Sequence, residues 1–182
     1  MQPGKFNVVL DGQFGSCGKG LISSYLAWQF RIPSISSTNM ANAGHTVVGT
    51  AGYKFIAKAL PASAILSNLH FNEELPPGSG HTDRRFYLGA SSGFTIDQLL
   101  KELDICELHH ESGHGVDRLY IHPRAGVITD EHKRQESGDD GNSTKHLAST
   151  MQGCGAMLAE KILRKKDVAL ARDYKECTPF LL

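Results

Sequence analysis

The 182-residue sequence has few cysteines, no excess of charge and no long apolar run. Lysine plus arginine and aspartate plus glutamate number 19 each, so no overall field attracts nucleic acid or an anionic membrane surface. No apolar stretch approaches the roughly 18 residues of a membrane-spanning helix, and no basic, apolar signal region follows Met1. We therefore expect a soluble, cytoplasmic protein that holds any anion locally. The four cysteines lack the paired spacing of a disulfide framework or zinc knot, which favours reduced thiols; they are Cys17, Cys106, Cys154 and Cys177.

Apolar spacing predicts strands that alternate with helices, which is typical of an α/β fold with a mostly parallel central sheet flanked by helices. At 40% hydrophobic content, residues 1–182 can bury the core of one domain. The predicted strands are 6–10, 33–38, 86–90, 119–122 and 168–171, with a hairpin from 46–48 and 53–56. The predicted helices are 21–27, 95–103 and the last part of 149–165, and the clearest loop is 67–83.

A glycine-rich stretch, residues 12–20, joins the first predicted strand to the first predicted helix. Glycines let backbone N–H groups approach phosphate oxygens, the helix N-terminus favours negative charge, and Lys19 neutralises it. The spacing differs from the usual P-loop, and neither Ser nor Thr follows Lys19. We interpret the stretch as a phosphate-binding loop of another kind, with a purely structural turn as the alternative.

A second polar turn, residues 42–46, contains His45 beside Gly44. Histidine titrates near working pH, so it can donate a proton or stabilise charge on a transferred phosphoryl group. Taken alone, a histidine in such a turn is more often structural or solvated than catalytic.

Residues 110–114 match the H-E-x-x-H pattern of zinc proteases. That pattern needs a helix, which sets both imidazoles on one face. Gly113 and Gly115 break a helix, so a solvated, histidine-rich surface loop is the favoured interpretation.

Five stretches resemble adenylosuccinate synthetase in their order along the chain. Residues 12–20 are similar to that family's G-Q-W-G-D-E-G-K-G, and residues 41–48 to its N-N-A-G-H-T-V-V. Residues 58–66, 119–132 and 149–153 resemble its H-L-L-P-S-G-I-L, L-x-I-S-x-x-A-H-V-I-x-P-Y-H and T-T-G-K-G segments. The resemblance covers nearly the whole chain and identifies it as the N-terminal part of such a protein.

The resemblance implies a P-loop-NTPase-like fold and a purine-biosynthesis ligase. In that family a triphosphate, ATP or GTP, phosphorylates the 6-oxygen of a purine monophosphate, and the amino group of L-aspartate then displaces the phosphate. Magnesium bridges the phosphates, a loop base takes a purine proton, and a histidine stabilises the developing charge. A homodimer is implied for the full-length protein, with no nucleic-acid or membrane partner.

The resemblance also assigns roles residue by residue. Ser16 and His45 occupy the catalytic positions, and Ser16 and the Gly44 carbonyl occupy the magnesium positions. Nucleotide contact falls to Gly15, Ser16, Cys17, Gly18, Lys19, Gly20, Gly44, His45 and Thr46. Purine monophosphate contact falls to Ser16, Asn42, Thr150 and Gln152.

The loop departs from the family pattern at Ser16 and Cys17, where the family has Asp and Glu. A serine hydroxyl is far too weakly acidic to replace the carboxylate directly as base. The shorter side chain leaves room for a purine with a 2-amino group, and Ser16 and Gln152 both resemble the phage-type branch of the family, which acts on dGMP. We therefore favour dGMP as substrate, with an ordinary synthetase acting on IMP with GTP as the alternative.

Several family segments do not appear in the sequence, including the aspartate loop and the segment that reads the triphosphate base. We therefore expect negligible synthetase activity from the isolated chain. One interpretation is a shortened enzyme, and the other is a stand-alone, non-catalytic nucleotide-binding module. The apolar residues within 177–182 have no evident element to bury them, which favours the shortened enzyme and predicts poor solubility.

Overall fold

The computed structural model describes residues 1–2, 4–10, 12, 17–49, 52–68, 84–108, 118–138 and 149–182. The helices are α1 (Lys19–Gln29), α2 (Ile96–Ile105), α3 (Asp130–Ser137) and α4 (Cys154–Ile162), with 3₁₀ segments at Ala62–Ser67, Ala171–Asp173 and Thr178–Phe180. The strands are β1 (Ser34–Ser37), β2 (His45–Val48), β3 (Lys54–Ala57), β4 (Arg85–Leu88), β5 (Gly93–Phe94), β6 (Leu119–Ile121) and β7 (Gly126–Val127).

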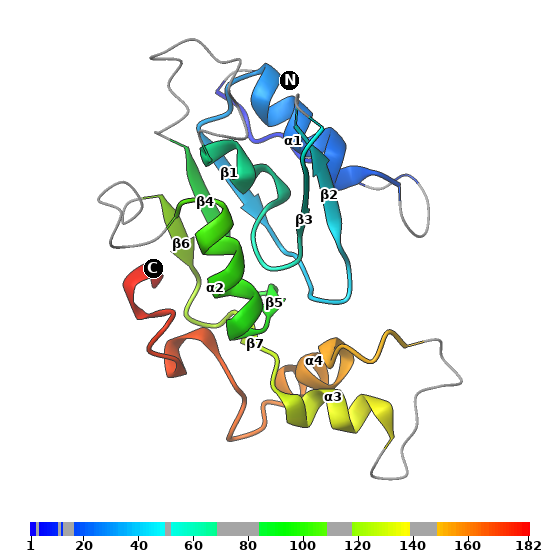
Figure 1. The fold of residues 1–182 in the computed structure, drawn as a ribbon. Helices are drawn as coiled ribbons and strands as arrows, with labels where there is room; N and C mark the ends of the chain where they lie inside the picture. The colour runs from blue at the N-terminus through cyan, green and yellow to red at the C-terminus, as the bar shows by residue number, and fades with distance from the viewer. Residues whose placement is uncertain are drawn as a thin grey trace.

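The main sheet is parallel, with the strand order β1–β4–β6. Strands β2 and β3 form an antiparallel hairpin, and the short strands β5 and β7 pair in parallel. Figure 1 shows the helices around these strands, so the predicted α/β class with a mostly parallel sheet is confirmed. The predicted strands near 33–38, 86–90 and 119–122, the hairpin and the three predicted helices are all present.

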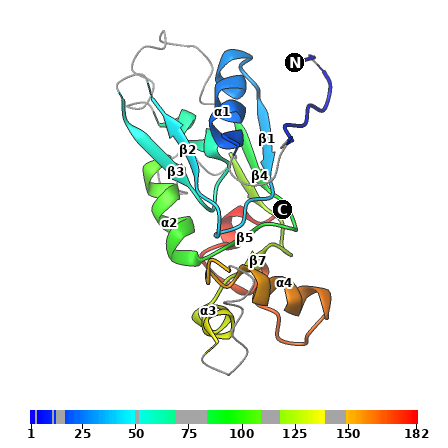
Figure 2. The ribbon, with the colours of Figure 1, turned by 90° about the vertical axis from the view of Figure 1, so that its right-hand side faces the viewer.

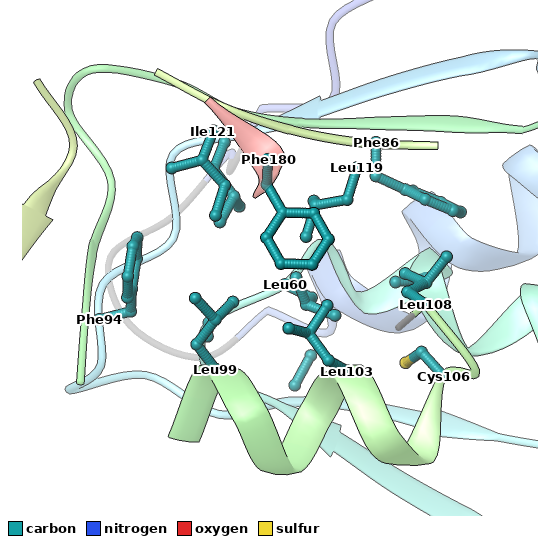
Figure 3. Close-up of a cluster of buried hydrophobic side chains, with 14 of the residues drawn as sticks. Leu60, Phe86, Phe94, Leu99, Leu103, Cys106, Leu108, Leu119, Ile121 and Phe180 are labelled. Atoms are coloured by element: carbon teal, nitrogen blue, oxygen red, sulfur yellow. The ribbon is translucent and has the colours of Figure 1, made fainter. Parts of the chain in front are cut away.

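The core lies between the main sheet and α2 (Figure 3). Thr95 caps α2 by accepting a hydrogen bond from the Gln98 backbone N–H, and the helix then turns Leu99 and Leu103 inward. These leucines meet apolar side chains from β4, β6 and the C-terminal segment, including Phe86, Leu119, Ile121 and Phe180. Apolar burial of this kind is the main stabilising contribution to the fold.

A buried carboxylate, Glu102 on α2, fixes the segment that follows the hairpin. Its oxygens accept hydrogen bonds from the backbone N–H groups of Lys58 (2.7 Å), Ala59 (3.1 and 3.2 Å) and Leu60 (2.8 Å). The side chain of Gln98 donates a further hydrogen bond at 2.7 Å. Glu102 is fully buried, and this set of donors explains how its charge is accommodated.

Helix α1 packs through small residues. Gly20, Ser24 and Ala27 are buried, whereas Tyr25 and Trp28 lie on the exposed side. The C-terminal end of the helix is held by the buried Arg84, whose guanidinium donates to the carbonyl oxygens of Ala27 (3.2 Å) and Ile32 (3.3 Å). Burial and the nearby charge of Arg118 lower the pKa of Arg84 to about 10. A cation at this end also complements the helix dipole.

Helices α3 and α4 pack against each other next to β5 and β7, below them in Figures 1 and 2. Helix α3 begins with a capping box at Thr129 and ends at Gly138, whose φ of 86° suits glycine. His132 on α3 lies 3.0 Å from a carboxylate oxygen of Glu160 on α4. Burial opposes ionisation of Glu160, but hydrogen bonds from His132 and Lys165 outweigh it and lower the pKa of Glu160.

The predicted strand 6–10 is wrong. Residues 4–10 pair with no strand in the described part of the chain, and Phe6, Val8 and Leu10 are exposed. The Asn7 side chain instead donates hydrogen bonds to the carbonyl oxygens of Gln2 (3.2 Å) and Lys5 (2.9 Å). These local bonds favour a turn over a sheet ladder.

The predictions for the C-terminal region are also wrong. In place of a strand at 168–171, Leu170 forms one isolated bridge with Gly126, and a 3₁₀ turn follows because Asp173 accepts from the Leu170 N–H at 3.2 Å. The terminal apolar residues are not left without cover, since Cys177 and Phe180 are buried in the core. The expectation of an exposed apolar end is therefore corrected.

Most of the predicted loop 67–83 and the whole H-E-x-x-H stretch lie outside the described residues. Within the described ranges, no helix is long and apolar enough to cross a membrane.

Replacing Glu102 with Gln should destabilise the fold by about 2–3 kcal/mol, because the new amide N–H₂ faces buried backbone N–H donors. Urea denaturation measures the change. The exposed Glu131→Gln serves as the control and should change stability by less than about 0.5 kcal/mol. Equal midpoints for the two variants would contradict the role given to Glu102.

Candidate nucleotide-binding site

The glycine-rich stretch leads directly into α1. Gly18 is the N-cap residue with a φ of 75°, in the left-handed region that favours glycine, and Lys19 is the first helical residue. Within the described residues 17–29, the helix has no side-chain N-cap and no acidic residue in its first turn. Its N-terminus is therefore suited to an anion. Gly15 and Ser16 lie outside the described residues, and Cys17 is exposed.

Gly20 brings the glycine-rich stretch into contact with the second motif. A Cβ atom on Gly20 would lie 2.5 Å from the Cβ atom of His45 and 3.1 Å from its Cα atom, so only glycine fits. The Gly20 carbonyl faces into α1, where it accepts hydrogen bonds from the hydroxyls of Ser23 (3.0 Å) and Ser24 (2.8 Å). Gly20 thus fixes the distance between α1 and the first residue of β2.

The turn before β2 presents the remaining predicted residues to solvent. Its backbone is closed by a hydrogen bond from the Ala43 N–H to the Met40 carbonyl oxygen at 3.1 Å. His45 is half-buried, and the other predicted contacts of this turn, Asn42, Gly44 and Thr46, are exposed. A solvent-facing turn around a partly buried histidine fits a site where a bound nucleotide meets a fixed imidazole.

The start of α4 joins this turn through Cys154. Cys154 belongs to a small buried cluster with Ala41, Ile128 and Met157. Burial raises the pKa of Cys154, as does the charge of Glu136, while the nearby backbone of Asn42 and Ala41 acts in the opposite direction. The helix that follows the loop of Thr150 and Gln152 is therefore anchored to the backbone beside Asn42.

Thr150 and Gln152 are both exposed on the loop before α4. The Gln152 side chain donates to the Thr150 carbonyl oxygen at 3.4 Å, and Met151 between them has a φ of 55°. The loop ends at Gly153, where a Cβ atom would lie 2.9 Å from side-chain atoms of His132 and Ile128. The structure thus places the start of α1 against His45, and the start of α4, which follows the loop at 149–153, in one buried cluster with Ala41.

Sequence reasoning missed Glu136, which is buried on α3 and accepts hydrogen bonds from the start of α4. The helix that carries it was not predicted. The sequence does contain start and stop signals for this helix: Thr129 can cap its N-terminus, acidic residues fill its first turn and Gly138 ends it.

An open hollow of about 550 Å³ lies elsewhere, between β3 and α2. It is lined by residues such as Tyr53, Ile56, Lys101 and Ile105, and by none of the predicted site residues. Among the described residues of the candidate site, Asn42, Gly44, Thr46, Thr150 and Gln152 face solvent.

The described residues of this surface fit magnesium as an ion held largely by phosphate oxygens. No group of three or more His, Cys, Asp or Glu side chains in the described ranges could hold a metal ion. The exposed Gly44 supplies a backbone carbonyl, which is a hard oxygen ligand. Magnesium commonly keeps several waters and binds phosphates with few protein ligands, so this donor set is compatible with it.

The sequence profile of the adenylosuccinate synthetase family matches residues 8–171. The chain therefore belongs to the adenylosuccinate synthetase family. N6-succino-2-amino-2'-deoxyadenylate synthase of Vibrio phage phiVC8 is 35% identical over 170 residues, which are 92% of this chain and 43% of the phage protein. Adenylosuccinate synthetase of Pyrococcus horikoshii is 30% identical, with 96% of this chain and 45% of that protein covered.

The fold is similar to that of the cyanophage S-2L succinoaminodeoxyadenylate synthetase, solved with dGMP and with dATP as an energy donor. The TM-score is 0.66 at 27% identity, over 93% of this chain and 42% of that one. The predicted family resemblance and P-loop-like fold are confirmed. The chain spans less than half the length of these relatives.

Replacing Gly20 with Ala should destabilise the chain, although alanine normally favours a helix over glycine by up to about 1 kcal/mol. The reason is the overlap between the added methyl group and His45. Thermal denaturation gives the sign of the change, and Ser23→Ala in the same helix is the control with little expected effect. An increase in stability for Gly20→Ala would show that the helix and His45 are not in contact.

Proposed function

We propose that the chain carries the nucleotide-binding part of a purine-biosynthesis ligase, which joins aspartate to the 6-position of a purine monophosphate. The triphosphate binds at the N-terminus of α1, with Lys19 as counter-charge. The monophosphate binds at Asn42, Thr150 and Gln152. The domain extends over residues 1–182, as the N-terminal part of the complete enzyme.

The observation that supports this proposal most directly is the contact between Gly20 and His45. A loop that binds phosphate and a histidine that stabilises charge on the moving phosphoryl group must lie side by side for such a reaction. The two motifs are 25 positions apart in sequence and touch in the structure. A structural turn at either motif alone would need no such contact.

The proposed roles follow from position and chemistry. His45 stabilises the charge that develops on the 6-oxygen and the transferred phosphoryl group. The exposed Thr46 contacts the triphosphate, and the Gly44 carbonyl is offered to magnesium, which neutralises the phosphates when bound. Cys17 and Gly18 contribute to the loop that surrounds the phosphates.

We favour dGMP as the purine substrate. The sequence places Ser16 where the family has a carboxylate, which removes bulk and charge near the purine. The phage relative named above makes a 2-amino purine product by its name, and the cyanophage enzyme binds dGMP. The alternative substrate is IMP, because adenylosuccinate synthetases also match the chain at 30% identity.

Nucleotide binding by this chain should protect Cys17 from alkylation. Cys17 is exposed, whereas burial raises the pKa values of Cys106 and Cys154 and raises that of Cys177 to about 11. At pH 8 the three buried groups stay as thiols and react slowly. Mass spectrometry after iodoacetamide treatment should show Cys17 labelled first, at a rate that falls severalfold with magnesium and ATP.

The control ligand for this experiment is adenosine, which lacks phosphate and should give no protection. Unchanged labelling of Cys17 in the presence of ATP and of GTP would contradict triphosphate binding at the start of α1.

A form of the protein extended to the length of its relatives should release phosphate with dGMP, ATP and aspartate, and much less with IMP. The reason is the space that Ser16 leaves for a 2-amino group. Phosphate release and mass spectrometry of the nucleotide product measure the reaction, and the 182-residue chain serves as the inactive comparator. Turnover of IMP without turnover of dGMP would establish an ordinary synthetase instead.

A further inference from the structure

The carboxylate of Glu136 binds the backbone at the start of α4. One oxygen accepts from the Gly153 N–H at 2.9 Å and from the Ser149 hydroxyl at 3.2 Å. The other accepts from the Gly155 N–H and, at 3.2 Å, from the Ala156 N–H. A single side chain from α3 therefore contacts both ends of the loop at 149–153 and the first turn of α4.

This arrangement needs an acceptor with two oxygens and a negative charge. Each Glu136 oxygen receives two donors, and the charge lies at the positive end of the α4 dipole. An amide in its place would keep one oxygen and turn an N–H₂ group toward backbone N–H donors. Glu136 is buried, so water does not replace a lost hydrogen bond easily.

The Glu136 carboxylate also occupies backbone N–H groups of α4 that a ligand could otherwise use. The N–H groups of Gly153, Gly155 and Ala156 already donate to Glu136. These three N–H groups are therefore not offered to a phosphate near this loop, whereas the side chains of Thr150 and Gln152 are exposed there. Because Cys154 at the start of the same helix is buried in one cluster with Ala41, the neighbour of Asn42, the position of α4 affects where these side chains lie relative to Asn42.

We propose that Glu136 is a positioning residue for the purine monophosphate: it holds the loop at 149–153 so that Thr150 and Gln152 face the same ligand as Asn42. The inference rests on the proposed function. Glu136 itself touches no substrate, and its effect reaches the ligand through the backbone of Gly153, Gly155 and Ala156.

The test compares Glu136→Gln with the wild-type chain by calorimetry and by hydrogen exchange measured with NMR. The Glu136→Gln variant should bind dGMP at least about tenfold more weakly, while its ATP affinity changes less than about twofold. Amide exchange at Gly153, Gly155 and Ala156 should become at least about tenfold faster, with exchange at Leu103 in the core unchanged.

Glu131→Gln is the matched control, because it makes the same substitution on the same helix at an exposed site that pairs with Arg134. It should change neither affinity nor exchange. Glu136→Asp keeps the charge but shortens the side chain, and it should weaken dGMP binding less than Glu136→Gln. If the glutamine variant does not fold, the same comparison of dGMP affinity with ATP affinity is made with the aspartate variant.

Unchanged dGMP affinity in Glu136→Gln, or an equal loss for dGMP and ATP, would overturn the positioning role. A different result, namely a wild-type chain that binds neither dGMP nor IMP, would contradict the proposed function. In that case the three amide exchange rates still decide whether Glu136 holds the loop.

Discussion

The close approach of Gly20 to His45 is the constraint on which the site depends. An added Cβ atom would overlap the histidine, so α1 and β2 can meet at this distance only through glycine. Because α1 begins at the glycine-rich stretch and β2 begins at His45, this contact fixes the helix end that we propose to bind phosphate beside an imidazole. At its other end the same helix is held by Arg84. The position of α1 therefore determines the distance between its N-terminus and His45.

Two buried carboxylates, Glu102 and Glu136, each fix a backbone segment by accepting hydrogen bonds from several of its N–H groups. Glu102 binds three consecutive backbone N–H groups after the hairpin, and Glu136 binds those at the start of α4. Loop and helix-end N–H groups have no partner within their own element, and a carboxylate on a neighbouring helix satisfies several of them at once. Such contacts fix backbone positions more sharply than apolar packing, because each hydrogen bond has a preferred direction.

Local signals in the sequence predict much of this fold. Helix α2 has a cap and helical spacing, and the hairpin has alternating residues around a glycine turn, so both are present as predicted. The prediction of a strand at 6–10 is wrong because an apolar pattern does not show whether a neighbouring strand is available for pairing. Helix α3 was missed because it is almost entirely polar, and polar helices lack the apolar period. The motifs supply the candidate site residues, which stay predictions. They do not indicate Glu136, since its hydrogen-bond partners are 13 to 20 positions away in sequence.

The N-termini of α1 and α4, both near the candidate site, differ in the charge that lies beside them. Helix α4 already has the Glu136 carboxylate at its start, which accepts from the N–H groups of Gly153, Gly155 and Ala156 and opposes a second anion there. Helix α1 starts at Gly18 without an acidic first turn in its described residues, and Lys19 adds positive charge. This difference supports the proposal that the more highly charged ligand, a triphosphate, binds at α1. The proposed monophosphate site near α4 uses the neutral side chains of Thr150 and Gln152, so we expect its affinity to depend on where their loop is held.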